Sequence, residues 1–453
     1  MKPTRRSLLT GMSALALTPG CAGSRGKDPT DTGESSAPGP APERGPEPDA
    51  TWSPDGEVDW SAFPSGVQVG DVRENSAQVS VWMSAEAGEI DLAVASGDDW
   101  MPIGDSVSVI RDGMSAQVEL TGLEPDTAYC IVVRAGGVRS SASRFRTALA
   151  PDGMRQLTIG ATSCLHSNRP WKNMSEVAAV RPDMFMLLGD TVYADGATDL
   201  EGYRWHWRRA LTTQGLIDVS SQSSLIATWD DHEVTNDFEG LNTPVERVDV
   251  ALGAFREAIP QREGPGGGIW RKLSWGRAAD VFVLDGRGER DGEAQYLSRE
   301  QMDWLKAGLL ASTARFKLIM NSVPVTDYAP IFAQALVRDR WQGYPEQRSE
   351  ILDHIVANEL EGVLWITGDF HMCTASRLDP IEGVAADLWE VMVGPGGSFL
   401  NIAAQLVEPN DQFPVIFAEY CSTLIHLDPG TGAVRVEWIG DDGSIQGEIE
   451  FEI

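Results

Sequence analysis

Apolar and polar residues alternate with a period of two along residues 65–147. Val67–Gly70, Ala77–Trp82 and Gln117–Leu120 are clear examples, and turn-forming residues separate such runs. This period places successive side chains on opposite faces of a strand. The pattern predicts an all-β domain, which we assign to residues 60–149.

Beyond residue 155, short apolar runs alternate with helical segments. Such alternation builds a sheet flanked by helices, so it predicts an α/β domain over residues 155–453. Ser298 and Gln301 mark the start of one helix in the manner of a capping box. Three leucines are expected on one face of this helix, Leu305, Leu309 and Leu310. The C-terminal runs 433–439 and 445–453 predict a hairpin that completes a second sheet.

The N-terminal residues 1–21 have the features of a targeting segment. Thr4–Leu9 contains a twin-arginine pattern, and the apolar run after it is shorter than the roughly 20 residues that a permanent membrane span needs. Cys21 stands in a loose lipoprotein cleavage box, so we expect lipid attachment at Cys21 and export through the twin-arginine pathway to the periplasm or cell surface. Residues 22–55 contain almost no apolar residues and predict a flexible linker.

The net charge is −31, from 67 acidic and 36 basic residues. This charge argues against nonspecific binding of nucleic acid or anionic lipid, because such binding needs a basic surface. A site for an anion must therefore be locally positive, and bound cations could supply that charge. Among the cysteines, Cys373 with Cys421 is the pair that we consider for a disulfide. Buried unpaired thiols are the favoured interpretation.

Four apolar runs are each followed by a side chain of a type that binds metals. They are Leu157–Ile159 before Cys164, Met184–Leu188 before Asp190, Leu225–Thr228 before Asp231, and Val363–Thr367 before Asp369. Ligands in open α/β sheets lie outside the carboxyl ends of strands, where loops from different strands converge. Each fragment alone is more often a turn or a core residue. Together the four predict one composite metal centre.

The motifs around these residues resemble those of the PhoD-type alkaline phosphatases, a family of calcineurin-like metallophosphoesterases. The matching elements are Ser163-Cys164, Gly189-Asp190-x-x-Tyr193, Trp229-Asp230-Asp231-His232-Glu233-x-x-Asn236 and Gly368-Asp369-x-His371. The resemblance runs from about Gln156 to Pro395. It implies an α/β metallophosphoesterase sandwich of two sheets flanked by helices, preceded by an all-β fibronectin- or Ig-like domain. Within that domain, the run Leu123–Tyr129 resembles fibronectin type III sandwiches, in which Tyr129 would tie its strand to the preceding loop.

The resemblance also implies a dinuclear or larger centre of Fe³⁺ and Ca²⁺. Asp190 has two oxygens and can bridge two cations, and a phenolate such as that of Tyr193 binds a strongly acidic metal such as Fe³⁺. Cys164 and His371 would complete the protein ligands of the iron. The hard oxygens of two residues would hold the second ion, which the family pattern suggests is Ca²⁺, namely Asn236 and Asp369.

In this interpretation the chain hydrolyses phosphate mono- or diesters through a metal-bound hydroxide. Arg287 is the candidate for holding a phosphate oxygen, with a structural salt bridge to Asp285 or a neighbour as the alternative. Asp231 and His232 are expected beside the ligands or near the leaving group, and His166 could reach the substrate. Phosphodiesterase or phospholipase-type activity on the same centre is one alternative function. The other is a surface lipoprotein that binds a partner without catalysis.

Overall fold

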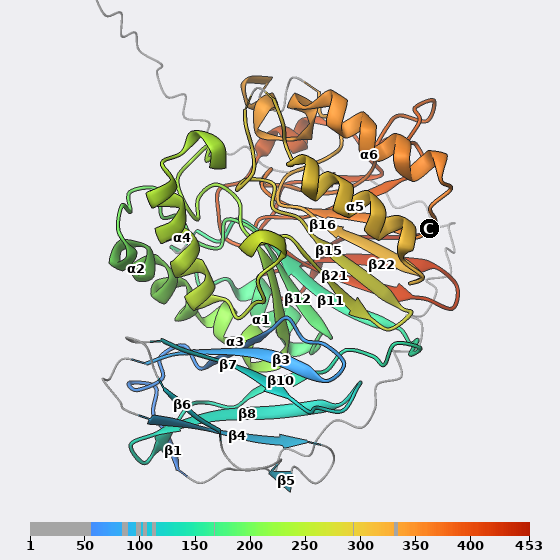
Figure 1. Cartoon of the computed structure of the whole chain (residues 1–453). Coiled ribbons are helices and arrows are strands. Elements are labelled where there is room, and N and C mark those ends of the chain that lie inside the picture. Colours follow the sequence, from blue (N-terminus) through green and yellow to red (C-terminus); the bar gives the residue numbers. More distant parts are fainter. Residues whose placement is uncertain are drawn as a thin grey trace, which may run out of the picture. The chain divides into compact units, whose positions relative to one another are not determined.

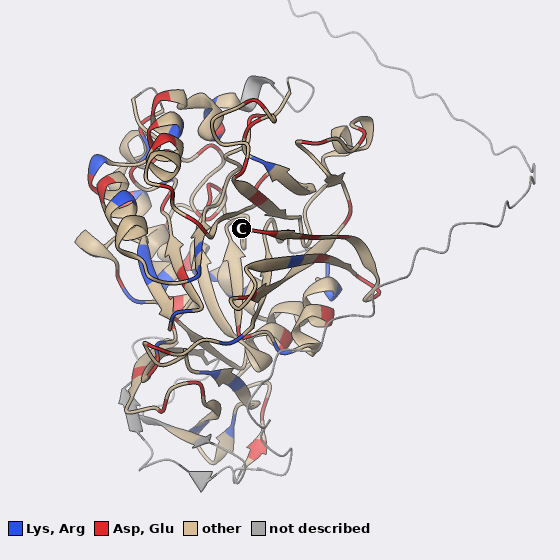
Figure 2. Ribbon diagram, turned by 90° about the vertical axis from the view of Figure 1, so that its right-hand side faces the viewer, with Lys and Arg blue, Asp and Glu red and all other residues tan. Residues whose placement is uncertain are grey.

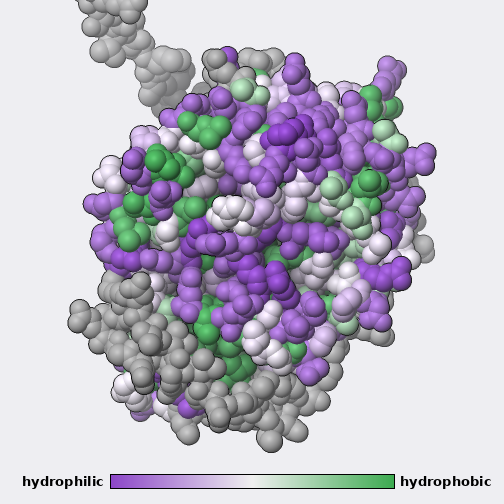
Figure 3. Space-filling model, viewed as in Figure 1, coloured by the Kyte–Doolittle hydropathy of each residue, from purple (hydrophilic) through white to green (hydrophobic). Residues whose placement is uncertain are grey.

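The computed structural model describes residues 56–83, 89–96, 101–102, 107–110, 115–166, 168–292, 294–329 and 334–453. The predicted targeting segment, the linker and Cys21 lie outside these ranges. Among the described helices, none is both long and apolar enough to cross a membrane. Figure 2 shows acidic residues on helices, loops and strands alike, with basic residues interspersed. The face seen in Figure 3 is mostly hydrophilic where it is described, with separate small apolar patches.

The first sheet has nine strands and a parallel centre. In spatial order they are β23 (Ile445–Glu452), β22 (Ala433–Gly440), β21 (Cys421–Asp428), β11 (Leu157–Thr162), β12 (Met184–Leu188), β13 (Ser224–Thr228), β2 (Val67–Gly70), β3 (Ser76–Trp82) and β7 (Ser115–Thr121). β11, β12 and β13 are parallel neighbours, whereas β21 pairs antiparallel with β11.

The second sheet has seven strands. In spatial order they are β14 (Arg271–Trp275), β15 (Ala279–Val283), β16 (Phe316–Met320), β17 (Val363–Thr367), β19 (Trp389–Val393), β18 (Cys373–Arg377) and β20 (Val415–Phe417). β15, β16, β17 and β19 are parallel. Trp438 of the first sheet donates its indole N–H to the carbonyl of Met392 in the second (3.0 Å).

Strand side chains alternate between the core shared by the two sheets and the helices outside. In β12, Met184, Met186 and Leu188 belong to the shared core, whereas Phe185 and Leu187 pack in the cluster with the helices of the first sheet. Those helices are α1 (Lys172–Ala179), α2 (Leu200–Leu211), α3 (Gln214–Gln222) and α4 (Val245–Ala258). α5 (Arg299–Ala311) and α6 (Pro345–Ala357) cover the second sheet (Figure 1). Both faces of each parallel centre are thus buried, which explains the nearly continuous apolar runs in the sequence.

The remaining strands all come from the N-terminal part and form a third sheet. They are β1 (Glu57–Val58), β9 (Val138–Arg139), β8 (Ala128–Ala135), β4 (Glu89–Ser96) and β5 (Met101–Pro102), with β10 (Ser143–Arg146) beside β8 and β6 (Val107–Ile110) beside β4. The Tyr129 hydroxyl accepts a hydrogen bond from the Glu124 backbone N–H (2.8 Å), so the predicted tie between strand and preceding loop is confirmed. The other N-terminal strands, β2, β3 and β7, extend the first sheet through the Leu225–Gly70 pairing.

Local predictions for the α/β part are confirmed in most details. Ser298 caps α5 by accepting the N–H of Gln301 (3.2 Å), but Leu310 is 58% exposed, so its assignment to the buried face is wrong. The C-terminal hairpin forms as β22 and β23, yet the prediction that it completes a second sheet is wrong. It extends the first sheet, because β22 pairs with β21 and β21 pairs with β11. The described cysteines are buried free thiols: Cys130, Cys164, Cys373 and Cys421.

Candidate metal centre

The candidate ligands stand on loops that follow β11, β12, β13 and β17. The parallel arrangement of β11, β12 and β13 brings their carboxyl ends to one edge of the first sheet. Backbone hydrogen bonds join these loops, from Cys164 N–H to the Gly189 carbonyl (3.2 Å) and from Leu165 N–H to the Asp190 carbonyl (2.7 Å). The Cys164 thiol lies 3.6 Å from the Asp369 carbonyl oxygen of the second sheet. The two sheets therefore meet at this site.

Four of the predicted ligands have left-handed backbone conformations. Their φ angles are 55° at Cys164, 54° at Asp190, 63° at Asp369 and 55° at His371. Residues other than glycine seldom adopt positive φ, and such strain collects at functional sites. Each of these residues lies in a sharply turning loop after a strand, with Asp369 and His371 in the same loop, and the turns bring the four side chains to one place.

Asp190 is the common member of three groups of potential metal ligands. Within each group, one donor atom per residue lies within 4.8 Å of the others. The groups are Cys164 with Asp190 and His371, Asp190 with Asp231 and His232, and Asp190 with Asp230 and Asp369. A carboxylate at the intersection of such groups has the position that a bridging ligand requires.

Asp190 also has a buried oxygen without a hydrogen-bond donor. The Tyr193 hydroxyl donates to Oδ2 of Asp190 (3.2 Å) and lies 3.0 Å from the Ser398 hydroxyl oxygen. Oδ1 receives no hydrogen bond from any described residue, although Asp190 is only 1% exposed. An unsatisfied buried polar atom costs about 1–3 kcal/mol. A cation beside Oδ1 would remove that cost, so the donor set fits a metal ion.

The pKa shifts within the cluster also indicate a metal site. Burial, followed by the surrounding negative charges, holds the pKa of Asp190, Cys164, Tyr193 and Asp369 well above the usual range of each group. Burial lowers the pKa of His371 to about 4, so the ring is neutral and able to coordinate. Without a cation, burial therefore disfavours the ionised forms in which Asp190, Cys164, Tyr193 and Asp369 would bind a metal. A multivalent cation would lower the pKa of these four groups, and it would bind the neutral His371 ring as it stands.

His232 lies beside this cluster and is held by Asp195. The ring nitrogen Nδ1 is 2.8 Å from an Asp195 oxygen, and the ring centroid is 4.2 Å from that of Tyr193. Burial alone would lower the pKa of His232, but the hydrogen bond to Asp195 and the charges of Asp190 and Asp231 outweigh it and raise the pKa to about 10. Burial raises the pKa of Asp231 to about 6.

Arg287 is fully buried and surrounded by carboxylates. Its Nε lies 2.7 Å from Oδ1 of Asp230, its Nη2 lies 3.0 Å from Oδ2 of the same residue, and its Nη1 lies 2.5 Å from Asp339. Nη2 is also 3.9 Å from Asp231. With 0% exposure, this geometry favours the structural salt bridge over direct phosphate binding, with Asp230 and Asp339 as the partners. Asp285 instead accepts the Arg287 backbone N–H (3.1 Å).

Asn236 is exposed, unlike the buried candidates Cys164 and Asp190. Its side-chain amide donates to Asp237 (2.8 Å), and its backbone N–H donates to Asp195 (2.6 Å). Asp237 belongs to a separate acidic group with Asp231 and Asp339. The structure thus places Asn236 next to that second group.

Glu233 is a functional candidate that the sequence analysis left without a role. Its fully buried carboxylate accepts three backbone N–H groups, from Asp190 (3.0 Å), Thr191 (2.6 Å) and Asp230 (2.9 Å). It therefore holds together the loops after β12 and β13, both of which carry candidate ligands. The glutamate within the Trp-Asp-Asp-His-Glu string was the available signal.

The fold and the site together define a class. A solved structure described as "Structure of PhoD" aligns with a TM-score of 0.76 and 22% identity over 88% of this chain and 90% of that chain. Purple acid phosphatase PPD1 from yellow lupin (Lupinus luteus) seeds aligns with a TM-score of 0.65 and 12% identity, over 85% of this chain and 73% of that one. The chain thus has the mixed-sheet fold shared by these phosphatases.

Sequence comparison gives the family. A model described as PhoD-like phosphatase matches residues 159–419, more than half of the chain, and the chain belongs to that family. Alkaline phosphatase D of Bacillus subtilis (strain 168) is 26% identical over 320 residues. That alignment covers 58% of this chain and 54% of the relative, so it spans about half the length of that protein.

Proposed function

We propose that this protein is a metal-dependent phosphoesterase that hydrolyses phosphate mono- or diesters. The observation that carries the proposal is Asp190, a buried carboxylate shared by three groups of potential ligands and left with an unsatisfied oxygen. Membership of the PhoD-like phosphatase family supports the same activity. Because the net charge is −31, an anionic substrate needs a locally positive site, and bound cations could supply that charge.

In this proposal Cys164, Asp190, Tyr193 and His371 would hold Fe³⁺, because thiolate, phenolate and imidazole favour a transition metal over Ca²⁺. Asp369 and Asn236 would offer oxygen ligands for Ca²⁺, and the two oxygens of Asp190 would be available to both ions. When bound, the cations would acidify water and neutralise charge on the phosphate.

Other residues of the chain would position the metal ligands and add charge and hydrogen bonds around the ions. Arg287 orients Asp230 and balances part of the negative charge around it, while Glu233 holds the two ligand loops in register. His232, fixed by Asp195, lies where it can donate a hydrogen bond to a phosphate oxygen or to the leaving group. Asp231 lies beside His232, and its negative charge stabilises the protonated form of the ring.

We further propose export and a modular organisation. The twin-arginine pattern and Cys21 support passage of the folded protein across the membrane and tethering by a lipid, with residues 22–55 as the spacer. The region 60–149 is proposed as a fibronectin-like structural module, on the strength of its strands and the Tyr129 tie.

Hydrolysis of p-nitrophenyl phosphate and bis(p-nitrophenyl) phosphate by the iron- and calcium-supplemented protein tests the proposal. Asp369→Asn should lose about 100-fold or more of the activity, as expected for a ligand of the ions. Asp183→Asn is the matched control, since Asp183 is also buried (3% exposed) but lies at the opposite end of β12. There it accepts the Thr158 N–H (2.9 Å) and pairs with Arg155 (2.9 Å), which keeps Asp126 as a second partner (2.7 Å) in the variant. Wild-type activity in Asp369→Asn would refute the site. The ratio of the two rates separates monoesterase from diesterase.

A second experiment addresses the iron. Tyrosinate bound to Fe³⁺ absorbs visible light, so Tyr193→Phe should abolish the colour of the loaded protein while leaving its fold intact. Colour that persists in the variant would remove Tyr193 from the ligands. If the wild type lacks both bound metal and activity, the alternative of a binding lipoprotein gains support.

A further inference from the structure

A cavity of about 360 Å³ adjoins the candidate metal centre. Its lining residues are His166, Asn168, Arg169, Gly397, Ser398, Phe399 and Tyr420. Several of them touch candidate ligands. The Ser398 hydroxyl oxygen is 3.0 Å from the Tyr193 hydroxyl, its backbone N–H donates to the Cys164 carbonyl (2.8 Å), and the Phe399 ring lies 4.9 Å from that of His371. A group bonded to a phosphate at the metal centre would enter this inner cavity.

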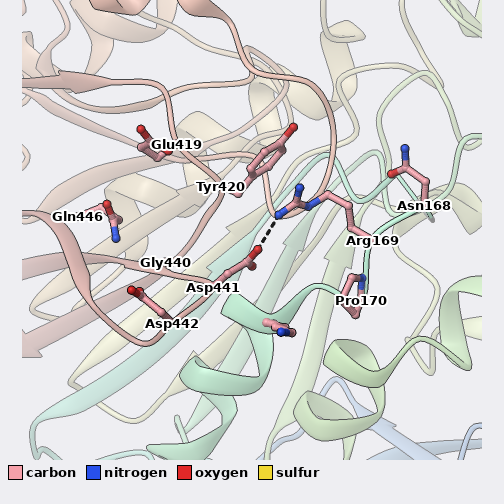
Figure 4. A pocket seen from close by; sticks show the side chains of 10 residues that line it. Asn168, Arg169, Pro170, Glu419, Tyr420, Gly440, Asp441, Asp442 and Gln446 are labelled. Carbon is pink, nitrogen blue, oxygen red and sulfur yellow. Dashed lines mark hydrogen bonds and ion pairs between the residues drawn. The ribbon is translucent and has the colours of Figure 1, made fainter. Parts of the chain in front are cut away.

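A second cavity of about 720 Å³ lies next to the first and shares Asn168, Arg169 and Tyr420 with it. Figure 4 shows its walls, formed by the segment from Asn168 to Pro170, the segment around Tyr420 and the turn at Asp441 and Asp442. Besides Arg169 and Asp441, this outer cavity is lined by Lys172, Glu419, Asp442 and Gln446. Charged side chains of both signs therefore line this cavity.

Arg169 stands at the boundary of the two cavities and is held there. Its Nη2 pairs with Asp441 (2.5 Å), and its guanidinium carbon lies 3.8 Å from the centroid of the Tyr420 ring. Asp441 is in turn bound by the side-chain amide of buried Asn173 (2.8 Å), which also donates to the Gly396 carbonyl (3.0 Å) beside the inner cavity. Because its contacts lead back to buried residues, Arg169 forms a wall in a defined position.

The two cavities differ in the chemistry they offer. The inner one presents the rings of His166, Phe399 and Tyr420, and Phe399 is 69% exposed, as expected of a surface that stacks against a ligand. The outer one presents donors and acceptors of both charges. A phosphate with a small substituent would fill only the inner cavity, whereas the combined space lies in the range of sites for extended ligands.

We propose that the two cavities form one substrate cleft, and that Arg169 and Tyr420 determine specificity for phosphodiesters with an extended hydrophilic substituent. The inference rests on the proposed phosphoesterase function. In it, the phosphate lies at the metal centre and the substituent crosses the inner cavity. The polar far end of the substituent forms hydrogen bonds in the outer cavity.

Two substrates with the same leaving group test this inference. The metal-loaded protein is given methyl p-nitrophenyl phosphate or p-nitrophenyl thymidine 5′-phosphate, and kcat/KM is measured for each. The wild type should favour the nucleoside diester by about tenfold or more, as a pocket that binds the longer group requires. In Arg169→Ala, and independently in Tyr420→Ala, this ratio should fall toward one. Arg299→Ala removes an arginine paired with Glu350 outside the cleft and should keep the wild-type ratio.

The possible failures are distinguishable. Hydrolysis of both diesters with a wild-type ratio near one, or with a ratio that neither cleft variant changes, would overturn the cleft and leave the phosphoesterase proposal standing. If the metal-loaded wild type hydrolyses neither these diesters nor p-nitrophenyl phosphate, the proposed function is wrong and the cleft assignment is overturned with it.

Discussion

Two buried arginine–aspartate pairs in this protein have nearly the same geometry and very different surroundings. Arg271 binds Asp71 through Nε and Nη2, both at 2.6 Å, and joins β14 to the residue after β2. Arg287 binds Asp230 in the same two-pronged way, at 2.7 and 3.0 Å. Both arginines have side-chain exposures of 6% or less. The bidentate pairing alone therefore does not distinguish a structural pair from a functional one.

The number of carboxylates per arginine makes the difference. Arg271 has one acidic partner, so that pair is neutral. Arg287 lies within 4.0 Å of carboxylates from Asp230, Asp231 and Asp339. Asp339 is shared with buried Arg290 (3.3 Å), whereas Asp230 groups with two further carboxylates, Asp190 and Asp369. Buried charge of one sign is strongly unfavourable unless it is paired. A surplus of buried carboxylates around one arginine is thus the physical signature of a cation site.

The largest expected effect on stability comes from breaking the neutral pair. Asp71→Asn keeps the side-chain shape and tolerates the left-handed φ of 43° at this position, but it leaves Arg271 buried without its charge partner. Removing one member of a buried pair costs about 3–5 kcal/mol of unfolding free energy. Urea unfolding should show this loss while the metal content stays at the wild-type level. A loss of metal in this variant would contradict the separation of the two pairs.

Glu233→Gln should have a smaller effect, and it should change the metal affinity instead of the stability of the fold. The amide has one acceptor oxygen in place of two and directs N–H groups toward backbone N–H groups, so the loops after β12 and β13 lose their common anchor. Residues that orient ligands typically change metal affinity by about 10–100-fold. Competition with a chelator measures this change. Asp183→Asn is the control. An equal loss of metal affinity in both variants would show that Glu233 stabilises the fold in general and does not specifically orient the ligand loops.

The surplus of charge also predicts how pH affects the metal-free protein. Burial raises the pKa of Asp231 from 3.8 to about 6 and that of Glu233 from 4.5 to about 7. At these two groups the folded state binds more protons than the unfolded state between these values, so their contribution to the unfolding free energy should fall as the pH rises from about 4 to about 7. His371, whose pKa burial lowers from 6.5 to about 4, contributes in the opposite direction. Thermal unfolding of the wild type and of Glu233→Gln with a chelator present isolates the contribution of Glu233. The stability of the wild type relative to the variant should fall over this interval, and a relative stability that rises would count against the surplus.

The smallest effect is expected at the surface. Arg299 forms ion pairs with Asp303 and Glu350, both at 2.8 Å, but its side chain is 54% exposed. Exposed pairs contribute about 0–1 kcal/mol. Arg299→Ala should therefore change the unfolding free energy far less than Asp71→Asn does. A comparable loss of unfolding free energy in the two variants would show that burial does not decide how much an ion pair contributes to stability in this protein.

The sequence allowed the strand ends to be predicted, because parallel strands bring their carboxyl ends to one edge of a sheet. Asp190, Asp369 and Cys164 were found in this way. Arg287 was predicted to hold phosphate because a guanidinium suits that role. Its burial depends on Asp230 and Asp339, more than fifty residues away on either side, and no local pattern contains that information.

The cleft could not be predicted from the sequence for the same reason. Arg169 and Asp441 are separated by 272 positions, and only the antiparallel pairing of β21 with β11 and of β22 with β21 brings them together. That pairing is also what placed the C-terminal hairpin on the first sheet. Local rules were sufficient where the interaction is local, as at Ser298 and Tyr129.

Thermal unfolding of the wild type and of Asp190→Asn, each with chelator and with iron and calcium, tests the central claim most directly. The account predicts that the metal-free variant is more stable than the metal-free wild type, because it lacks the buried carboxyl whose ionisation burial opposes, and that only the wild type is strongly stabilised by the metals. A variant that is less stable without metal, or that gains as much from the metals as the wild type, would contradict the assignment of Asp190 as the shared ligand of a cation site.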